Sequence, residues 1–302
     1  MSDSSISSDD TQTKLLRNSL LAGSFAGMAS TLVCYPFDVL RIKIQSSAFD
    51  KTSVGVIGTF RQTIQSGGFR ALYVGLALPF GAQAIYKGTI FTVNNLTLEA
   101  LLDFHNKGRQ SHQGEYQLTS TDRFICGFTG GAINGGLFVT PVEYVRNRLI
   151  SEQGKSKAAK GTTISVIRST LINNGLSGLW RGMTSTVLRD SIGCGLYFVT
   201  MASAQEILSP NEKPSFQIVL LSGALSGIAF WVWALPIDTM KTWIQNGTAK
   251  NMREAVVLAS RKGATGSMLA LTRGWEVAYG RGAPSAAITV ATYTSTYHYL
   301  MN

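Results

Sequence analysis

The sequence predicts an all-α membrane protein assembled from three related segments. The pattern Pro-x-acid-x-x-base begins at Pro36, Pro141 and Pro236, with intervals of 105 and 95 residues. Three copies at such a spacing indicate an internal threefold repeat. Each copy ends a glycine-rich apolar stretch, and the twenty residues before the third copy, 216–235, contain no charged side chain. A helix of that length can cross a lipid bilayer.

Each copy of the pattern has a definite physical consequence. Proline removes a backbone donor and crowds the preceding turn, so it kinks a helix. The acid and the base then lie on one helical face just past the kink, because they are three residues apart. Charged groups beside a membrane-length apolar run are costly unless they pair or face water. The sequence therefore predicts a ring of ion pairs that acts as a gate, formed by Asp38, Arg41, Glu143, Arg146, Asp238 and Lys241.

A second element follows the first in each segment. It reads Gly-x-x-x-x-aromatic-x-Gly at residues 68–75 and 175–182, while a third copy at residues 274–282 is one residue longer. With these motifs the chain resembles the mitochondrial carrier family over roughly residues 14–302. The resemblance implies six transmembrane helices in three homologous two-helix repeats, with short matrix surface helices, arranged as a pseudo-threefold barrel around a central cavity.

The resemblance also divides the chain. It implies one transport domain made of repeat 1 (14–105), repeat 2 (118–210) and repeat 3 (213–302). Residues 1–13 are rich in Ser, Thr and Asp and lack an apolar or basic run, so they are expected to form a short disordered tail without a signal or transit peptide. The implied location is the mitochondrial inner membrane, as a multi-pass monomer, although the sequence leaves a peroxisomal or other organelle address open.

Apolar and amphipathic patterns place the individual helices. Spans are expected at residues 14–46, 79–102, 183–208, 216–236 and 283–301, and surface helices near residues 53–66, 162–173 and 251–262. Gly-x-x-x-Gly pairs, which allow close approach of a neighbouring helix, begin at Gly23, Gly127 and Gly223. The second pair lies one residue farther from its proline than the other two pairs.

Composition argues against several other classes of protein. The net charge of +10 is spread through loops and termini and does not form a stripe with interleaved aromatics, so nucleic-acid binding is not expected. Cys34, Cys126 and Cys194 have no Cys-x-x-Cys spacing, and the three histidines are scattered, so neither a disulfide nor a metal site is expected. No catalytic constellation is present, so the sequence predicts neither an enzyme nor a bound cofactor.

The family resemblance assigns partners within the gate. It implies the pairs Asp38–Arg146, Glu143–Lys241 and Asp238–Arg41, with Gln45 and Gln245 bracing them. Alternatively, these charges only orient the helices. The acidic and basic motif that the family carries at the cytosolic ends of its even-numbered helices is absent. The empty protein is therefore expected to be closed to the matrix and open to the cytosol.

The resemblance also indicates where a substrate binds. Family members use positions on the even-numbered helices seven residues past the last glycine of the second element, here called the closing glycine. Counting from Gly75, Gly182 and Gly282, which are also candidate cardiolipin positions, gives Ala82 with Gln83, Arg189 with Asp190, and Thr289. On this count the third repeat supplies no arginine. Tyr86 and Trp231 are further candidates for the cavity, although such aromatics more often serve packing.

The pair Arg189–Asp190 resembles the pair that amino-acid and carnitine carriers have at this position. An arginine can hold a carboxylate by two hydrogen bonds, and an aspartate can receive an ammonium group. Alternatively, the two charges only neutralise each other. The resemblance implies a transporter that moves a small amino-acid-like or carnitine-like zwitterion by alternating access, as an exchanger. The alternatives are a carrier-derived adaptor that does not transport, and a carrier for another carboxylate.

Overall fold

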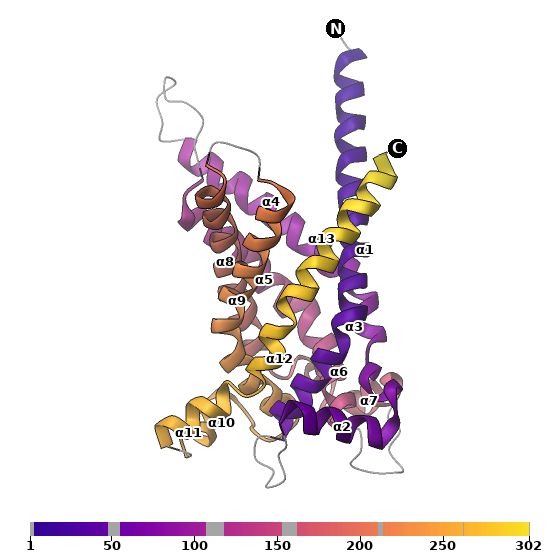
Figure 1. The fold of residues 1–302 in the computed structure, drawn as a ribbon, viewed down its shortest axis with the longest axis vertical. Helices are drawn as coiled ribbons and strands as arrows, with labels where there is room; N and C mark the ends of the chain where they lie inside the picture. The colour runs from indigo at the N-terminus through magenta and orange to yellow at the C-terminus, as the bar shows by residue number, and fades with distance from the viewer. Residues whose placement is uncertain are drawn as a thin grey trace.

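Every regular element in the described part of the chain is a helix. The computed structural model describes residues 3–47, 55–106, 118–152, 162–210, 214–261 and 263–301, and Figure 1 shows their arrangement. The long helices are α1 (Asp3–Ser46), α4 (Gln83–Asn106), α8 (Met183–Leu208), α9 (Phe216–Gln245) and α13 (Gly282–Met301), together with the continuous run α5 (Ser120–Asn134), η2 (Gly135–Val139) and α6 (Thr140–Glu152). The expected all-α class is confirmed.

The long helices form a closed ring. Each contacts the next in the order α1, α4, α5, α8, α9 and α13, and α13 returns to pack along α1, as Figure 1 shows for the indigo and yellow helices. The short elements are α2 (Val56–Gly67), η1 (Phe69–Tyr73), α3 (Ala77–Gly81), α7 (Thr163–Asn174), η3 (Leu176–Trp180), α10 (Met252–Ser260), α11 (Gly263–Leu271) and α12 (Trp275–Gly280). Each group of short elements links two long helices of one repeat.

Two helical runs in the described residues are long and apolar enough to cross a membrane by length and composition alone. They are Ser120–Glu152 and Phe216–Gln245, whose most apolar 18-residue stretches have mean hydropathies of 1.3 and 2.0. The other long helices have a lower mean hydropathy because they carry polar side chains that the fold buries, such as Arg189 and Asp190 on α8. Hydropathy alone therefore does not indicate six spans.

The N-terminal residues differ from expectation. Helix α1 begins at Asp3, so the chain is helical through most of residues 1–13, where a disordered tail was expected. Extending an existing helix needs no new nucleus, so a polar sequence can continue a helix that is already formed. An acidic residue such as Asp3 is also favoured at a helix N-terminus by the helix dipole.

A π-helical turn accounts for the irregular spacing in repeat 2. The extra residue between Gly131 and Pro141 falls in η2, which has the wider π-helical geometry, and such turns accommodate one inserted residue in an α-helix. The Thr140 hydroxyl donates a 2.6 Å hydrogen bond to the Gly135 carbonyl, and the Trp180 indole donates a 2.9 Å hydrogen bond to the Gly136 carbonyl. The helix therefore stays continuous despite the inserted residue, and the Gly135 and Gly136 carbonyls accept hydrogen bonds from side chains.

The glycine pairs do not all serve the same purpose. On α5, a Cβ added to Gly127 would lie 2.5 Å from the Cys194 carbonyl oxygen, and one added to Gly131 would collide with the Asp190 carbonyl. On α9, a Cβ on Gly223 or Gly227 would meet nothing within 4 Å among the described residues. The α5 pair is thus required for close helix packing and the α9 pair is not. The α5 pair brings α5 against the part of α8 that carries Arg189 and Asp190.

Gly131→Ala is expected to destabilise the protein, because its Cβ meets backbone atoms of α8 that cannot move independently. Overpacking of this kind costs about 1–3 kcal/mol. Gly227→Ala is the matched control and is expected to leave stability unchanged or slightly raised, since alanine favours a helix. Melting temperatures of the two purified variants in detergent test this, and equal melting temperatures would contradict the close packing of α5 on α8.

Candidate functional site

Three glycines mark equivalent places in the three repeats. Gly75, Gly182 and Gly274 have φ angles of 80°, 85° and 82°, in the left-handed region that favours glycine. A Cβ on Gly75 would lie 3.4 Å from the side chain of Arg146, and one on Gly274 would lie 3.6 Å from the side chain of Arg41. Two of these glycines therefore stand beside the basic gate residue of another repeat.

The closing glycine of repeat 3 is therefore Gly274, and the assignment of that role to Gly282 is wrong. Gly282 is instead the first residue of α13. The short helix α12 follows Gly274 just as α3 follows Gly75, and this helix accounts for the eight-residue difference. The candidate lipid position in repeat 3 moves to Gly274 with it.

The corrected count changes the third substrate position. Seven residues past the three closing glycines lie Ala82, Arg189 and Arg281, which we call the contact layer. Repeat 3 does supply an arginine, contrary to expectation. Thr289 lies eight residues beyond Arg281, half-buried on α13 and about 12 Å away along the helix at 1.5 Å per residue. It is therefore not equivalent to Ala82 and Arg189.

The structure forms two of the three implied gate pairs. Lys241 contacts Glu143, and Arg41 Nη2 lies 3.5 Å from Asp238 Oδ2. The pair Asp38–Arg146 is not formed. Arg146 Nη2 instead bonds Glu143 Oε1 on its own helix at 3.2 Å.

Asp38 has a different partner from the one expected. Its Oδ1 accepts a 2.6 Å bond from Arg281 Nη1, which reaches it from the junction of α12 and α13. Arg281, a residue of the contact layer, thus replaces Arg146 as the partner of Asp38 in the gate ring. The reason is geometric, because Arg146 is satisfied locally by an acid one turn away while Arg281 approaches Asp38 from the neighbouring repeat.

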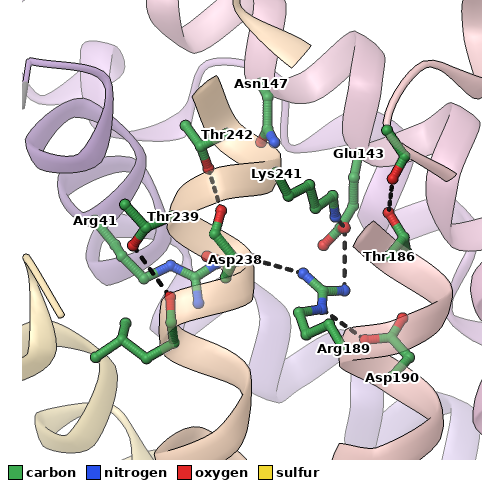
Figure 2. A network of polar contacts seen from close by, with 12 residues as sticks. Arg41, Glu143, Asn147, Thr186, Arg189, Asp190, Asp238, Thr239, Lys241 and Thr242 are labelled. Carbon is green, nitrogen blue, oxygen red and sulfur yellow. Dashed lines mark hydrogen bonds and ion pairs between the residues drawn. The ribbon is translucent and has the colours of Figure 1, made fainter. Parts of the chain in front are cut away.

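Arg189 is the centre of the polar network (Figure 2). Its Nε donates to Asp190 Oδ1 at 2.6 Å, its Nη1 to Asp238 Oδ1 at 2.6 Å, and its Nη2 to Glu143 Oε2 at 3.1 Å. Its side chain is only 7% exposed. The guanidinium from α8 therefore holds an acid from α6 and an acid from α9, in addition to the acid beside it. The predicted substrate residue and the predicted gate are one connected network.

The two bracing glutamines behave differently. Gln45 Nε2 donates to Asp238 Oδ2 at 3.2 Å, and its Oε1 accepts a 3.1 Å hydrogen bond from Thr242, so it supports the acid that Arg41 contacts. Gln245 Oε1 instead accepts a 2.5 Å hydrogen bond from Asn147. Gln245 therefore links α9 to α6 without touching the Glu143–Lys241 pair.

The remaining candidate residues surround this network. Gln83 donates to Thr31 at 2.7 Å, and Ala82 is buried. The Tyr86 hydroxyl is buried and has no hydrogen-bond partner in the part of the chain that the structure describes. The Trp231 ring lies 4.5 Å from the Arg41 guanidinium carbon, so its cation–π partner is a residue of the protein.

Arg281 and Lys87 are the interior residues that sequence reasoning missed. Arg281 would have been found by counting from Gly274, which also follows a basic residue, Arg273. Lys87 lies one helical turn past Gln83 and therefore on the same face of α4. A search of every even-numbered helix for charge, beyond the counted positions alone, would have identified it.

Comparison with known proteins agrees with this architecture. The family model described as mitochondrial carrier protein matches three times, at residues 12–105, 116–212 and 212–302. The mitochondrial arginine transporter BAC2 of Arabidopsis thaliana is 31% identical over 234 residues, which cover 75% of this chain and 73% of that protein. The mitochondrial glycine transporter YMC1 of Saccharomyces cerevisiae is 29% identical over 290 residues, with coverage of 91% and 88%.

A third relative covers most of both chains. The mitochondrial basic amino acids transporter of Bos taurus is 29% identical over 286 residues, which cover 92% of this chain and 91% of that protein. The three repeats, the equivalent closing glycines and the matches to the family model lead to one conclusion. The chain belongs to the mitochondrial carrier family.

Proposed function

We propose that the chain is a six-span carrier of the mitochondrial inner membrane that moves an amino-acid-like carboxylate by alternating access. The single observation that carries the proposal is the bonding of Arg189 to Asp190 and to two gate acids at once. Arginine is suited to planar recognition of a carboxylate. The relatives named for arginine, glycine and basic amino acid transport support an amino-acid-like substrate.

The network suggests how binding opens the gate. The Nε, Nη1 and Nη2 atoms of Arg189 each already bond an acid of the protein, so a substrate carboxylate competes with these acids for the guanidinium group. Replacement of Glu143 or Asp238 removes a bond between α8 and a gate helix. Binding energy would thereby weaken the matrix closure only when substrate is present, as a carrier requires.

Several further groups are available to a substrate. Arg41 Nε and Nη1 and the Tyr86 hydroxyl are buried without hydrogen-bond partners in the described residues. Buried unpaired donors cost free energy, so a ligand that satisfies them gains affinity. Asp190 would receive the ammonium group once the Arg189 guanidinium turns to the carboxylate.

The membrane arrangement supports the same function. Six long helical runs form the ring, and the proline-containing ends of α1, α6 and α9 are joined by the gate contacts. This corresponds to closure on the matrix side. A transport-inactive adaptor would have no need to retain these charges, and no observation on this chain favours one.

Arg189→Ala is expected to abolish uptake of amino acids into reconstituted liposomes, and Arg189→Lys to leave a small remnant because lysine cannot form the two-pronged contact. Removing one partner of a buried ion pair costs about 3–5 kcal/mol, so Arg189→Ala is also expected to melt at a lower temperature. Arg123→Ala is the control, because its ion pair with Glu206 is partly exposed and lies outside the Arg189 network. Near-normal uptake by Arg189→Ala would place the substrate elsewhere.

The Asp38–Arg281 pair is expected to show a coupling free energy. Asp38→Asn and Arg281→Gln should each destabilise the protein, while the double variant should lose less than the two losses added together, by about 0.5–3 kcal/mol. The same cycle between Asp38→Asn and Arg146→Gln is expected to be nearly additive. Unfolding measurements on the five variants decide which arginine is the partner, and coupling with Arg146 alone would restore the pairing that the family resemblance implied.

A further inference from the structure

Lys87 occupies a second layer of the interior, above the contact layer. It lies twelve residues past Gly75 on α4, and Cys194 lies twelve residues past Gly182 on α8. The two side chains are close enough to interact electrostatically, although α4 and α8 belong to different repeats. Because Ala82 and Arg189 are five residues nearer their closing glycines, this layer lies about 7.5 Å farther along the helices, away from the gate.

In the part of the chain that the structure describes, the surroundings of Lys87 leave room for its side chain and supply no acid. A Cβ on Gly27 of α1 would lie 2.7 Å from Gln83 Oε1 and 3.5 Å from Lys87 Cε, so this glycine allows both side chains to lie against α1. Lys87 is half-buried. Among the described residues its ammonium group has no hydrogen-bond or ion-pair partner, since the interior acids bond other bases.

The gate, the contact layer and the second layer together carry an excess of positive charge. Among their described residues, the acids are Asp38, Glu143, Asp190 and Asp238, and the bases are Arg41, Lys87, Arg146, Arg189, Lys241 and Arg281. Each acid has at least one basic partner in the described structure. Ionised groups within a membrane protein are costly without a partner and mark functional sites. A bound anion would therefore stabilise Lys87.

We propose that Lys87 binds a second anionic group of the substrate, so that the carrier selects an acidic amino acid over neutral and basic ones. The inference rests on the proposed function, in which Arg189 binds one carboxylate and Asp190 the ammonium group. Lys87 then binds the side-chain carboxylate, which extends away from the gate. The long flexible lysine side chain can reach a group between the two layers.

A basic amino acid fits this arrangement less well. Its side-chain cation would lie near Lys87, and Asp190, the acid of the contact layer, already receives the α-ammonium group. Like charges in a site of low dielectric repel strongly. On this proposal the chain differs in substrate preference from the relatives named as arginine and basic amino acid transporters.

Uptake of two matched substrate pairs into liposomes tests the inference. Glutamate and glutamine, and likewise aspartate and asparagine, differ only in the side-chain carboxylate, and arginine represents a basic substrate. The wild-type protein is expected to favour the acidic member of at least one pair tenfold or more in kcat/KM, and to favour it over arginine. Lys87→Gln is expected to reduce that ratio at least tenfold while uptake of the neutral member stays within twofold.

Two further variants separate charge from structure. Lys87→Arg is expected to retain most of the acidic preference, and Lys250→Gln, which removes one exposed positive charge outside the interior, is expected to match the wild type. Melting temperatures verify folding, and Lys87→Gln should be no less stable than the wild type because it removes an unpaired charge.

The outcomes distinguish this inference from the proposed function. Uptake of glutamine or arginine as good as that of the acids, or an unchanged ratio in Lys87→Gln, would overturn the role of Lys87 and leave amino-acid transport standing. Uptake of none of the five amino acids by the wild type would overturn both.

Discussion

The structure depends most on one guanidinium group bonded to three carboxylates. Arg189 joins α8 to α6 through Glu143 and to α9 through Asp238, and it also holds the adjacent Asp190. The guanidinium offsets part of the desolvation cost of the three carboxylates. Arg41 and Lys241 add positive charge beside Asp238 and Glu143. The same arrangement makes the network sensitive to any ligand that brings in a competing carboxylate.

The backbone of repeat 2 makes this network possible. Gly131 and Gly135 lie against Asp190, where a Cβ would meet the Asp190 backbone or its side chain. The π-helical turn at Gly135–Val139 lets the helix absorb one extra residue directly before Pro141. Small residues and a locally wider helix therefore bring α8 close enough to α5 and α6 for Arg189 to reach Glu143.

The three repeats contribute unequally to the interior. Repeat 2 supplies Arg189 and Asp190, repeat 3 supplies Arg281, and repeat 1 has Ala82 at the equivalent position. Repeat 1 contributes its charge one layer farther from the gate, at Lys87. The three repeats thus have similar backbones, but their charged side chains are distributed asymmetrically. Such asymmetry suits a substrate that itself has different groups at its two ends.

The sequence by itself determined the threefold repeat, the helical class and the bounds of α8, and it singled out Arg189 and Asp190 as candidate site residues. These follow from local signals, since proline, glycine spacing and apolar length act within a single helix. Tertiary structure alone decided that Gly274 closes the third element, that Arg281 bonds Asp38, and that Arg189 reaches the gate. The short helix α12 shifts the residue count along repeat 3 although the local sequence pattern looks the same. Which basic side chain pairs with a given acid depends on the distances between helices, and no single segment of the sequence encodes those distances.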